Sequence, residues 1–191
     1  MRSRALAIQH ARTHTVSKPW GIVDPRPWSN VCRNGKAIGE IWYKRPGGKA
    51  PDTALLLKLL FTSQPFSNQV HPDGAFARSI GLPNEKTEAW HVLSAALNAE
   101  VALGLKERLT SQQLRQAGAD GSIADLVVWH SVTQGDTTSF PPGRSRRSAG
   151  GLSLRRFSNA AMPRSACTTM VGNVASYRRR DCRGRRRPRQ I

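Results

Sequence analysis

The sequence predicts an all-β protein, a sandwich or barrel of short strands with a few short helices. Short apolar runs recur along the chain and are separated by glycine, proline and other turn residues. Only two segments have the pattern of a helix, and both are short. The length of 191 residues is enough for one ordinary domain.

The first predicted strands lie before residue 72. Gly39–Tyr43 (GEIWY) has the composition of a short strand. Thr53–Thr62 (TALLLKLLFT) is a continuous apolar run in which helix and strand compete. A buried strand is favoured there because the run is short and turn residues bound it. Phe66–His71 is a second extended segment, which ends at Pro72 and Asp73.

The later elements alternate between short helices and strands. We expect a helical turn, then two strands joined as a hairpin, then a short helix with a threonine N-cap, and a last strand. In chain order these are Ala75–Ile80, Glu88–Ser94, Glu100–Leu105, Thr110–Gln116 with its end at Gly118, and Leu126–Trp129.

Charge divides the chain into two compositions that meet near Thr138. The formal net charge is +18, and residues 138–191 contribute +13 of it through 14 arginines and a single acid, Asp181. Such high charge with few large apolar residues predicts low order. We therefore expect a flexible N-terminal extension over residues 1–17, a globular domain over 18–137 that begins irregularly at Pro19–Pro27, and a basic low-order tail over 138–191.

Several protein classes are excluded by composition. No apolar run approaches the ~18 residues that a membrane-spanning helix needs. Cys32, Cys167 and Cys182 are too few and too far apart for a disulfide scaffold or a zinc knuckle. The N-terminus lacks the apolar core of a secretory signal, so we expect a cytoplasmic protein.

One stretch carries candidate chemistry. In Ser67–Asp73 (SNQVHPD), strand alternation places Gln69 and His71 on one face. Glu88 follows seventeen positions after His71. An amide oxygen, an imidazole and a carboxylate can converge on one divalent ion, with zinc favoured and manganese or cobalt possible. A surface or satisfied core histidine and a solvated hairpin edge are the structural alternatives.

An ordered set of motifs over residues 18–137 resembles type I mannose-6-phosphate isomerases. The set comprises KPWG, GEIW, LLLKLLFT, QVHPD, KTEAW, ALGLK and DGSI…VVWH…GDT. The resemblance implies a cupin jelly roll that binds one Zn²⁺ per chain through Gln69, His71 and Glu88. It also implies interconversion of mannose 6-phosphate and fructose 6-phosphate, a sugar-phosphate substrate.

Two lysines are candidate substrate contacts. Lys86 is expected beside the metal, where it meets a phosphate or hydroxyl of the sugar and serves the catalysis. Lys58 interrupts an apolar run, which costs free energy unless the side chain faces a polar cavity. It is therefore a second cavity candidate, and a strand-end lysine whose head reaches solvent is the alternative.

The chain departs from the family pattern after Thr137. Arg146 stands where the family has a fourth ligand, a histidine, and arginine has no lone pair to donate to zinc. Read one base out of frame, residues 143–176 permit a strand-rich continuation of the family pattern, although position 146 still does not become histidine. We therefore expect an out-of-frame tail, an incomplete jelly roll, weak metal binding and little isomerase activity.

Two other functions remain open at this point. The arginine runs at 178–180 and 183–189 predict salt-sensitive binding to nucleic acid without sequence preference. A cupin-like module that binds metal or sugar without turnover is the other alternative. We expect no specific nucleic-acid partner and no membrane, and the oligomeric state is left open.

Overall fold

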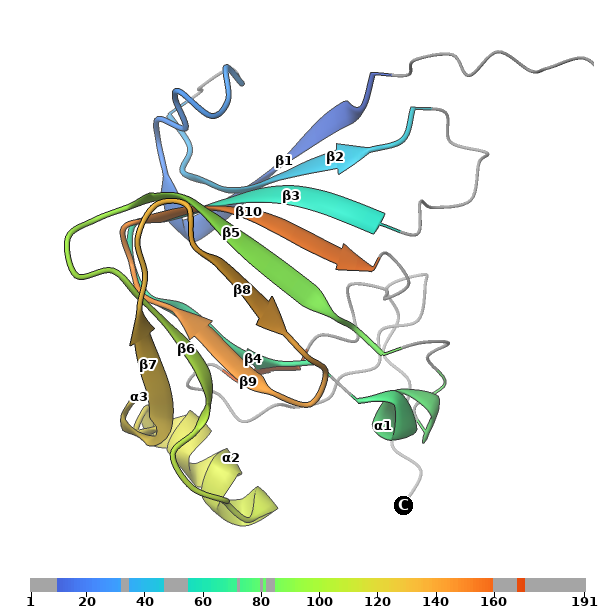
Figure 1. The fold of residues 1–191 in the computed structure, drawn as a ribbon, viewed down its shortest axis with the longest axis vertical. Coiled ribbons are helices and arrows are strands. Elements are labelled where there is room, and N and C mark those ends of the chain that lie inside the picture. The colour runs from blue at the N-terminus through green and yellow to red at the C-terminus, as the bar shows by residue number, and fades with distance from the viewer. Residues whose placement is uncertain are drawn as a thin grey trace, which may run out of the picture.

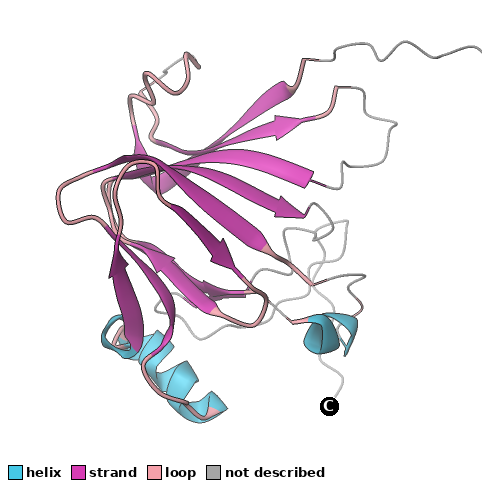
Figure 2. Ribbon diagram, viewed as in Figure 1, coloured by secondary structure: helices cyan, strands magenta, loops and turns pink. Residues whose placement is uncertain are grey.

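A computed structural model of the chain describes residues 10–31, 35–46, 55–71, 73–79, 81, 85–159 and 168–170. Strands dominate these residues (Figure 2), which confirms the predicted all-β class. In chain order the elements are β1 (Arg12–Ile22), β2 (Ile38–Lys44), β3 (Leu55–Thr62), β4 (Phe66–Val70), α1 (Gly74–Ser79), β5 (Glu88–Ala95), β6 (Glu100–Leu105), α2 (Ser111–Asp120), α3 (Ile123–Leu126), β7 (Val127–Ser131), β8 (Thr137–Phe140), β9 (Ser145–Ser148), β10 (Leu152–Asn159) and β11 (Thr168–Met170).

The strands form two antiparallel sheets that face each other (Figure 1). The larger sheet has the order β1-β2-β3-β10-β5-β8, and the smaller has the order β11-β4-β9-β6-β7. From β7 onward the chain crosses between the sheets at every step to β10, as in a jelly roll. None of the helices among the described residues is both long and apolar enough to cross a bilayer.

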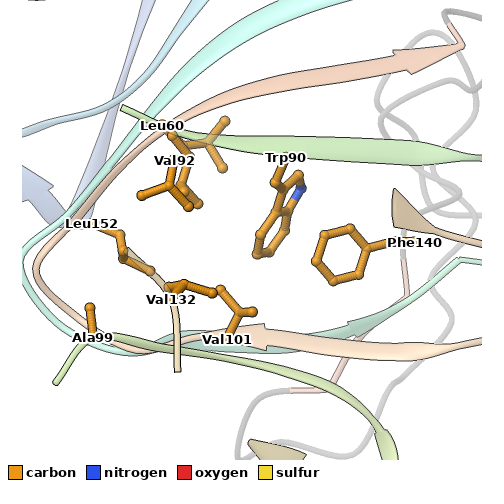
Figure 3. Packing of buried hydrophobic residues seen from close by; sticks show 9 residues of the cluster. Leu60, Trp90, Val92, Ala99, Val101, Val132, Phe140 and Leu152 are labelled. Carbon is orange, nitrogen blue, oxygen red and sulfur yellow. The ribbon is translucent and has the colours of Figure 1, made fainter. Parts of the chain in front are cut away.

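The main apolar core fills the space between the two sheets (Figure 3). Trp90 and Phe140 are its largest members, and their ring centroids lie 4.4 Å apart. The nine buried residues of this core are Leu60, Trp90, Val92, Ala99, Val101, Val132, Phe140, Leu152 and Leu154. Because successive strand residues point to opposite faces, Leu59 and Phe61 pack instead in a second cluster on the outer face of the larger sheet.

Strand β3 confirms the buried strand predicted over the apolar run. Its residues from Lys58 to Thr62 are all buried, and it lies between β2 and β10. Leu60 belongs to the main core, so the side chain of Lys58, two positions earlier, lies on the same inner face of the sheet. The strand therefore brings a lysine into the interior between the sheets.

The expectation of low order after residue 137 is wrong for the part of the tail that the structure describes. Strand β10 occupies the centre of the larger sheet, paired with β3 and β5. Leu152 and Leu154 alternate with more exposed residues and point into the core. This alternation over LSLRRFS is a strand signal that the overall charge of the tail obscures. The arginine runs at 178–189 lie outside the described residues.

The N-terminal expectation is also corrected. Strand β1 begins at Arg12 and pairs with β2, so residues 12–17 are ordered and the segment after Pro19 starts as a strand. Val16, Lys18 and Trp20 are half-buried along it, at every second position. Pairing with an apolar neighbouring strand stabilises a segment whose own composition is polar. Residues 1–9 lie outside the described residues.

The predicted hairpin of the fifth and sixth strands does not form. Strand β5 pairs with β10 and β8, whereas β6 pairs with β7 and β9 of the other sheet. Residues 96–99 are therefore a corner between the sheets, where Asn98 adopts a positive φ of 60°. The N-cap predicted at Thr110 is confirmed and forms a capping box with Gln113. The helix ends at Gly121 rather than at Gly118, which is buried inside it.

Candidate functional site

A buried carboxylate, Glu88, lies at the centre of the candidate site. Glu88 begins β5 in the larger sheet and is 1% exposed. His71 directly follows β4 in the smaller sheet and is fully buried. Its Nε2 lies 3.0 Å from Oε1 of Glu88, so the imidazole donates to the carboxylate. The imidazole and the carboxylate that the sequence analysis grouped are therefore in contact, and the site lies between the two sheets, because β4 and β5 belong to different sheets.

Three cationic side chains contact the same carboxylate. Lys86 Nζ lies 2.9 Å from Oε1, and Arg156 Nη1 lies 3.6 Å from the same oxygen. Arg146 Nε lies 3.1 Å from Oε2. Both arginines are buried, and the Lys86 side chain is 12% exposed. Two of these cations come from β9 and β10, strands of the segment that was expected to be of low order.

The charges around Glu88 lower its pKa. Burial by itself would raise the pKa of this carboxyl group. The positive charges of Arg156 and Lys86, together with a hydrogen bond from Lys86, outweigh that effect, so the pKa lies below the usual value of 4.5. Glu88 is consequently ionised at neutral pH and can accept hydrogen bonds at both oxygens. Trp90 Nε1 donates to Oε2 at 3.4 Å.

Lys58 belongs to a neighbouring ion pair on the same inner face. Its Nζ lies 3.6 Å from Oε2 of Glu40 and 3.5 Å from the centroid of the Trp42 ring. Burial and the nearby positive charge of Arg156 lower the pKa of Lys58 to about 7, against the opposing effect of Glu40. Lys58 and Arg156 are partners in the β3–β10 register, so this pair adjoins the Glu88 cluster.

Gln69 lies on the smaller sheet opposite Arg146. The two residues are direct partners in the antiparallel register of β4 and β9, and Gln69 is half-buried. Directly opposed residues in a sheet present their side chains to the same face. Of the predicted site residues, the structure thus joins His71, Lys86 and Glu88 by contacts, sets Gln69 across from Arg146, and places Lys58 in the adjoining pair.

Sequence reasoning missed Arg156, Glu40 and the inward position of Arg146. Arg156 follows Leu152 and Leu154 at alternate positions, so the strand pattern predicts that it faces inward. Glu40 precedes Trp42 by two positions and has a pKa below its usual value, because Arg156 and Lys58 outweigh the effect of burial. Alternation predicts the face on which such an arginine lies but not its burial, since burial of its charge depends on a carboxylate from another strand.

The residues around Glu88 do not fit a divalent cation. Every oxygen of Glu88 already accepts from or pairs with cationic groups, and a carboxylate offers only about four lone-pair positions. The permanently charged guanidinium of Arg146 lies at this carboxylate and would repel a metal ion. Among the residues that the structure describes, no three His, Cys, Asp or Glu side chains are grouped to hold a metal.

Sequence comparison finds similar proteins of known name. No protein-family model matches the chain. The chain is 33% identical over 183 residues to a mannose-6-phosphate isomerase of Streptococcus mutans, a match that covers 92% of this chain and 55% of that protein. It is 29% identical over 139 residues to a probable mannose-6-phosphate isomerase, GmuF, of Bacillus subtilis, covering 65% and 42%. The chain thus spans about half the length of these relatives.

Structure comparison finds the same fold in solved proteins. The mannose 6-phosphate isomerase of Bacillus subtilis superimposes with a TM-score of 0.70 at 20% identity, covering 94% of this chain and 65% of that one. A putative mannosephosphate isomerase of Archaeoglobus fulgidus gives a TM-score of 0.69 at 19% identity, covering 88% and 65%. Residues 1–137 alone cannot supply such coverage, so the similarity of fold extends into the segment after Thr137.

Proposed function

Because this chain belongs to the mannose-6-phosphate isomerase family and has the cupin-type fold, we propose that it binds a phosphorylated hexose between its sheets and has low isomerase activity. The proposed substrates are mannose 6-phosphate and fructose 6-phosphate. The observation that carries the proposal is the buried contact of His71 with Glu88, with Lys86 at its border.

Charge supports a phosphorylated ligand. Basic side chains outnumber carboxylates in this part of the interior, where Lys58, Lys86, Arg146 and Arg156 surround Glu40 and Glu88. Burial of net positive charge costs free energy unless an anion compensates it. A phosphate group carries up to two negative charges and accepts charge-assisted hydrogen bonds from lysine and arginine. An anionic sugar therefore complements this interior better than a neutral one does.

Lys86 is the residue that we propose to act on the substrate. Aldose–ketose isomerisation moves a proton between two neighbouring carbons through an enediol and needs a group that transfers it. Lys86 is the most exposed of the charged partners of Glu88, which makes it the one that a ligand reaches first. We assign Lys58 a substrate-binding role, since its ammonium group lies on the inner face next to Arg156.

Zinc is the cofactor that the resemblance implies. Gln69, His71 and Glu88 are its proposed donors, with one ion per chain. Arg146 beside Glu88 leaves these donors unsuited to the ion. We therefore propose weak zinc binding as the cause of the low activity, and we assign no catalytic step to the metal.

A coupled assay of mannose 6-phosphate conversion, with and without added zinc, tests the proposal on the full chain. We expect a slow reaction that Lys86→Met abolishes and Lys106→Met, at an exposed loop lysine, leaves unchanged. Calorimetry should show saturable binding of mannose 6-phosphate. Full activity with one zinc per chain would contradict the low activity, and absence of binding would contradict the sugar-phosphate site. Binding without turnover would identify a binding module instead.

Two further proposals concern the chain as a gene product. The first is the predicted single-base deletion near codon 138, which would place residues 138–191 out of frame; the central position of β10 in the larger sheet and the 92% coverage of this chain by the Streptococcus mutans match count against it. The coding DNA tests this, because another frame must then encode the continuation of the family pattern. We also propose a cytoplasmic location, which fractionation of the source cells would check.

A further inference from the structure

Side chains of this protein contact both carboxylate oxygens of Glu88, the atoms that would otherwise bind a metal ion. Oxygen Oε1 lies in contact with His71, Lys86 and Arg156. Oxygen Oε2 pairs with Arg146 and accepts a hydrogen bond from Trp90. Lys86, Arg146 and Arg156 together bring three positive charges within 3.6 Å of one carboxylate. This charge exceeds that of a divalent ion, and it is covalently fixed.

Arg146 differs from the other two cations in its position. It projects from β9 of the smaller sheet, directly across from Gln69 and on the sheet that also carries His71. Lys86 lies just before β5, the strand that begins with Glu88. Arg156 lies on β10, which pairs with β5 in the same larger sheet. Arg146 therefore reaches Glu88 from the same side as the amide and the imidazole, and it is 1% exposed.

We infer that the guanidinium group of Arg146 takes the place of a divalent cation, and that this one side chain closes a latent metal site formed by Gln69, His71 and Glu88. Arginine cannot deprotonate to make room for a metal, and its charge repels one. The substitution Arg146→His removes that permanent charge and adds an imidazole nitrogen as a metal donor opposite Gln69. The donor set then has two imidazoles, an amide oxygen and a carboxylate, a mixture that suits zinc.

This inference concerns metal affinity and does not depend on the proposed isomerisation. A chain that never turns over a sugar would still gain a metal site on exchange of Arg146. The readout is consequently metal binding, so failure of this inference and failure of the proposed function are distinguishable.

Cobalt(II) is the probe for the test, since its visible absorption reports on protein ligands, and zinc competes for the same site. The full chain and the variants Arg146→His and Arg147→His are titrated with Co²⁺. Arg147 is the control, because it is the next residue of β9 and lies on the opposite face. We expect Arg146→His to bind one Co²⁺ per chain at least about a hundredfold more tightly than the unchanged chain, and Arg147→His to resemble the unchanged chain.

Two results would overturn the inference. One is saturable binding of Co²⁺ or Zn²⁺ to the unchanged chain with the affinity of Arg146→His. The other is a cooperatively folded Arg146→His variant without a gain in affinity. If that variant does not fold, the melting temperature of the unchanged chain decides. Because its zinc binding is expected to be weak, we expect no shift with a chelator or with about micromolar Zn²⁺, and a rise at that zinc concentration would contradict us.

Discussion

Arg146 and Glu88 form a buried ion pair, with 3.1 Å between Nε and Oε2, that joins the smaller sheet to the larger one. Both side chains are at most 1% exposed. A buried charge is tolerated only when it is paired, so each residue makes the burial of the other possible. The pair thus links the predicted site to β9, a strand that was not predicted because the charge of residues 138–191 indicated low order.

Loss of the central carboxylate should destabilise the fold. Glu88→Gln leaves Lys86, Arg146 and Arg156 without their shared counter-charge in the interior. We expect the free energy of unfolding to fall by about 3–5 kcal/mol in urea denaturation. Glu107→Gln, at an exposed position, is the control and should change it by no more than about 0.5 kcal/mol. Equal stability of the two variants would show that the cations do not depend on Glu88.

Stability should fall at acid pH because of Glu40 and Glu88. Both carboxyl groups have pKa values below 4.5 in the folded chain. The unfolded chain binds more protons as pH falls, so the stabilisation is complete above the unfolded pKa of 4.5 and is lost below it. Urea unfolding measured from pH 6 down to about pH 3 should show this loss. A pH-independent free energy of unfolding over this range would contradict the ion-pair assignments.

Lys58 should extend the same trend, a rise of stability with pH, into the alkaline range. Its pKa is about 7 in the folded chain and 10.5 in the unfolded chain. Between these values the unfolded chain binds more protons, so the free energy of unfolding rises with pH from about 7 to about 10.5. Lys58→Met should remove this contribution, while Lys44→Met, at an exposed strand end, should keep it. Equal pH slopes for the unchanged chain and Lys58→Met would contradict the prediction.

A single leucine tests whether the segment after residue 137 is part of the fold. Leu154 is fully buried in the main core, on a strand between β3 and β5. Leu154→Ala should lower the free energy of unfolding by about 2–5 kcal/mol, as measured by urea denaturation. Arg155→Ala, at the exposed neighbouring position, serves as the comparison and should have a small effect. A low-order tail would make both substitutions neutral.

Local patterns were enough to predict much of the fold. The apolar run of β3, the strand β2 and the capping box at Thr110 each depend on a few neighbouring residues. Alternation placed Gln69 and His71 on one face, and the family motifs pointed to Glu88. The meeting of His71 with Glu88 was therefore within reach of the sequence, because each residue lies at the end of a recognisable strand.

The sequence by itself determined the strand-rich class, the family resemblance and the residue types at the centre of the site, since periodicity and motifs are local properties. Only the tertiary structure decided that β5 and β6 separate into different sheets, that β10 lies between β3 and β5, and that Arg146 and Arg156 are buried. The physical reason is that a charged side chain has no intrinsic preference for the interior. Its burial depends on a counter-charge that a distant strand supplies, and composition does not record which strands become neighbours.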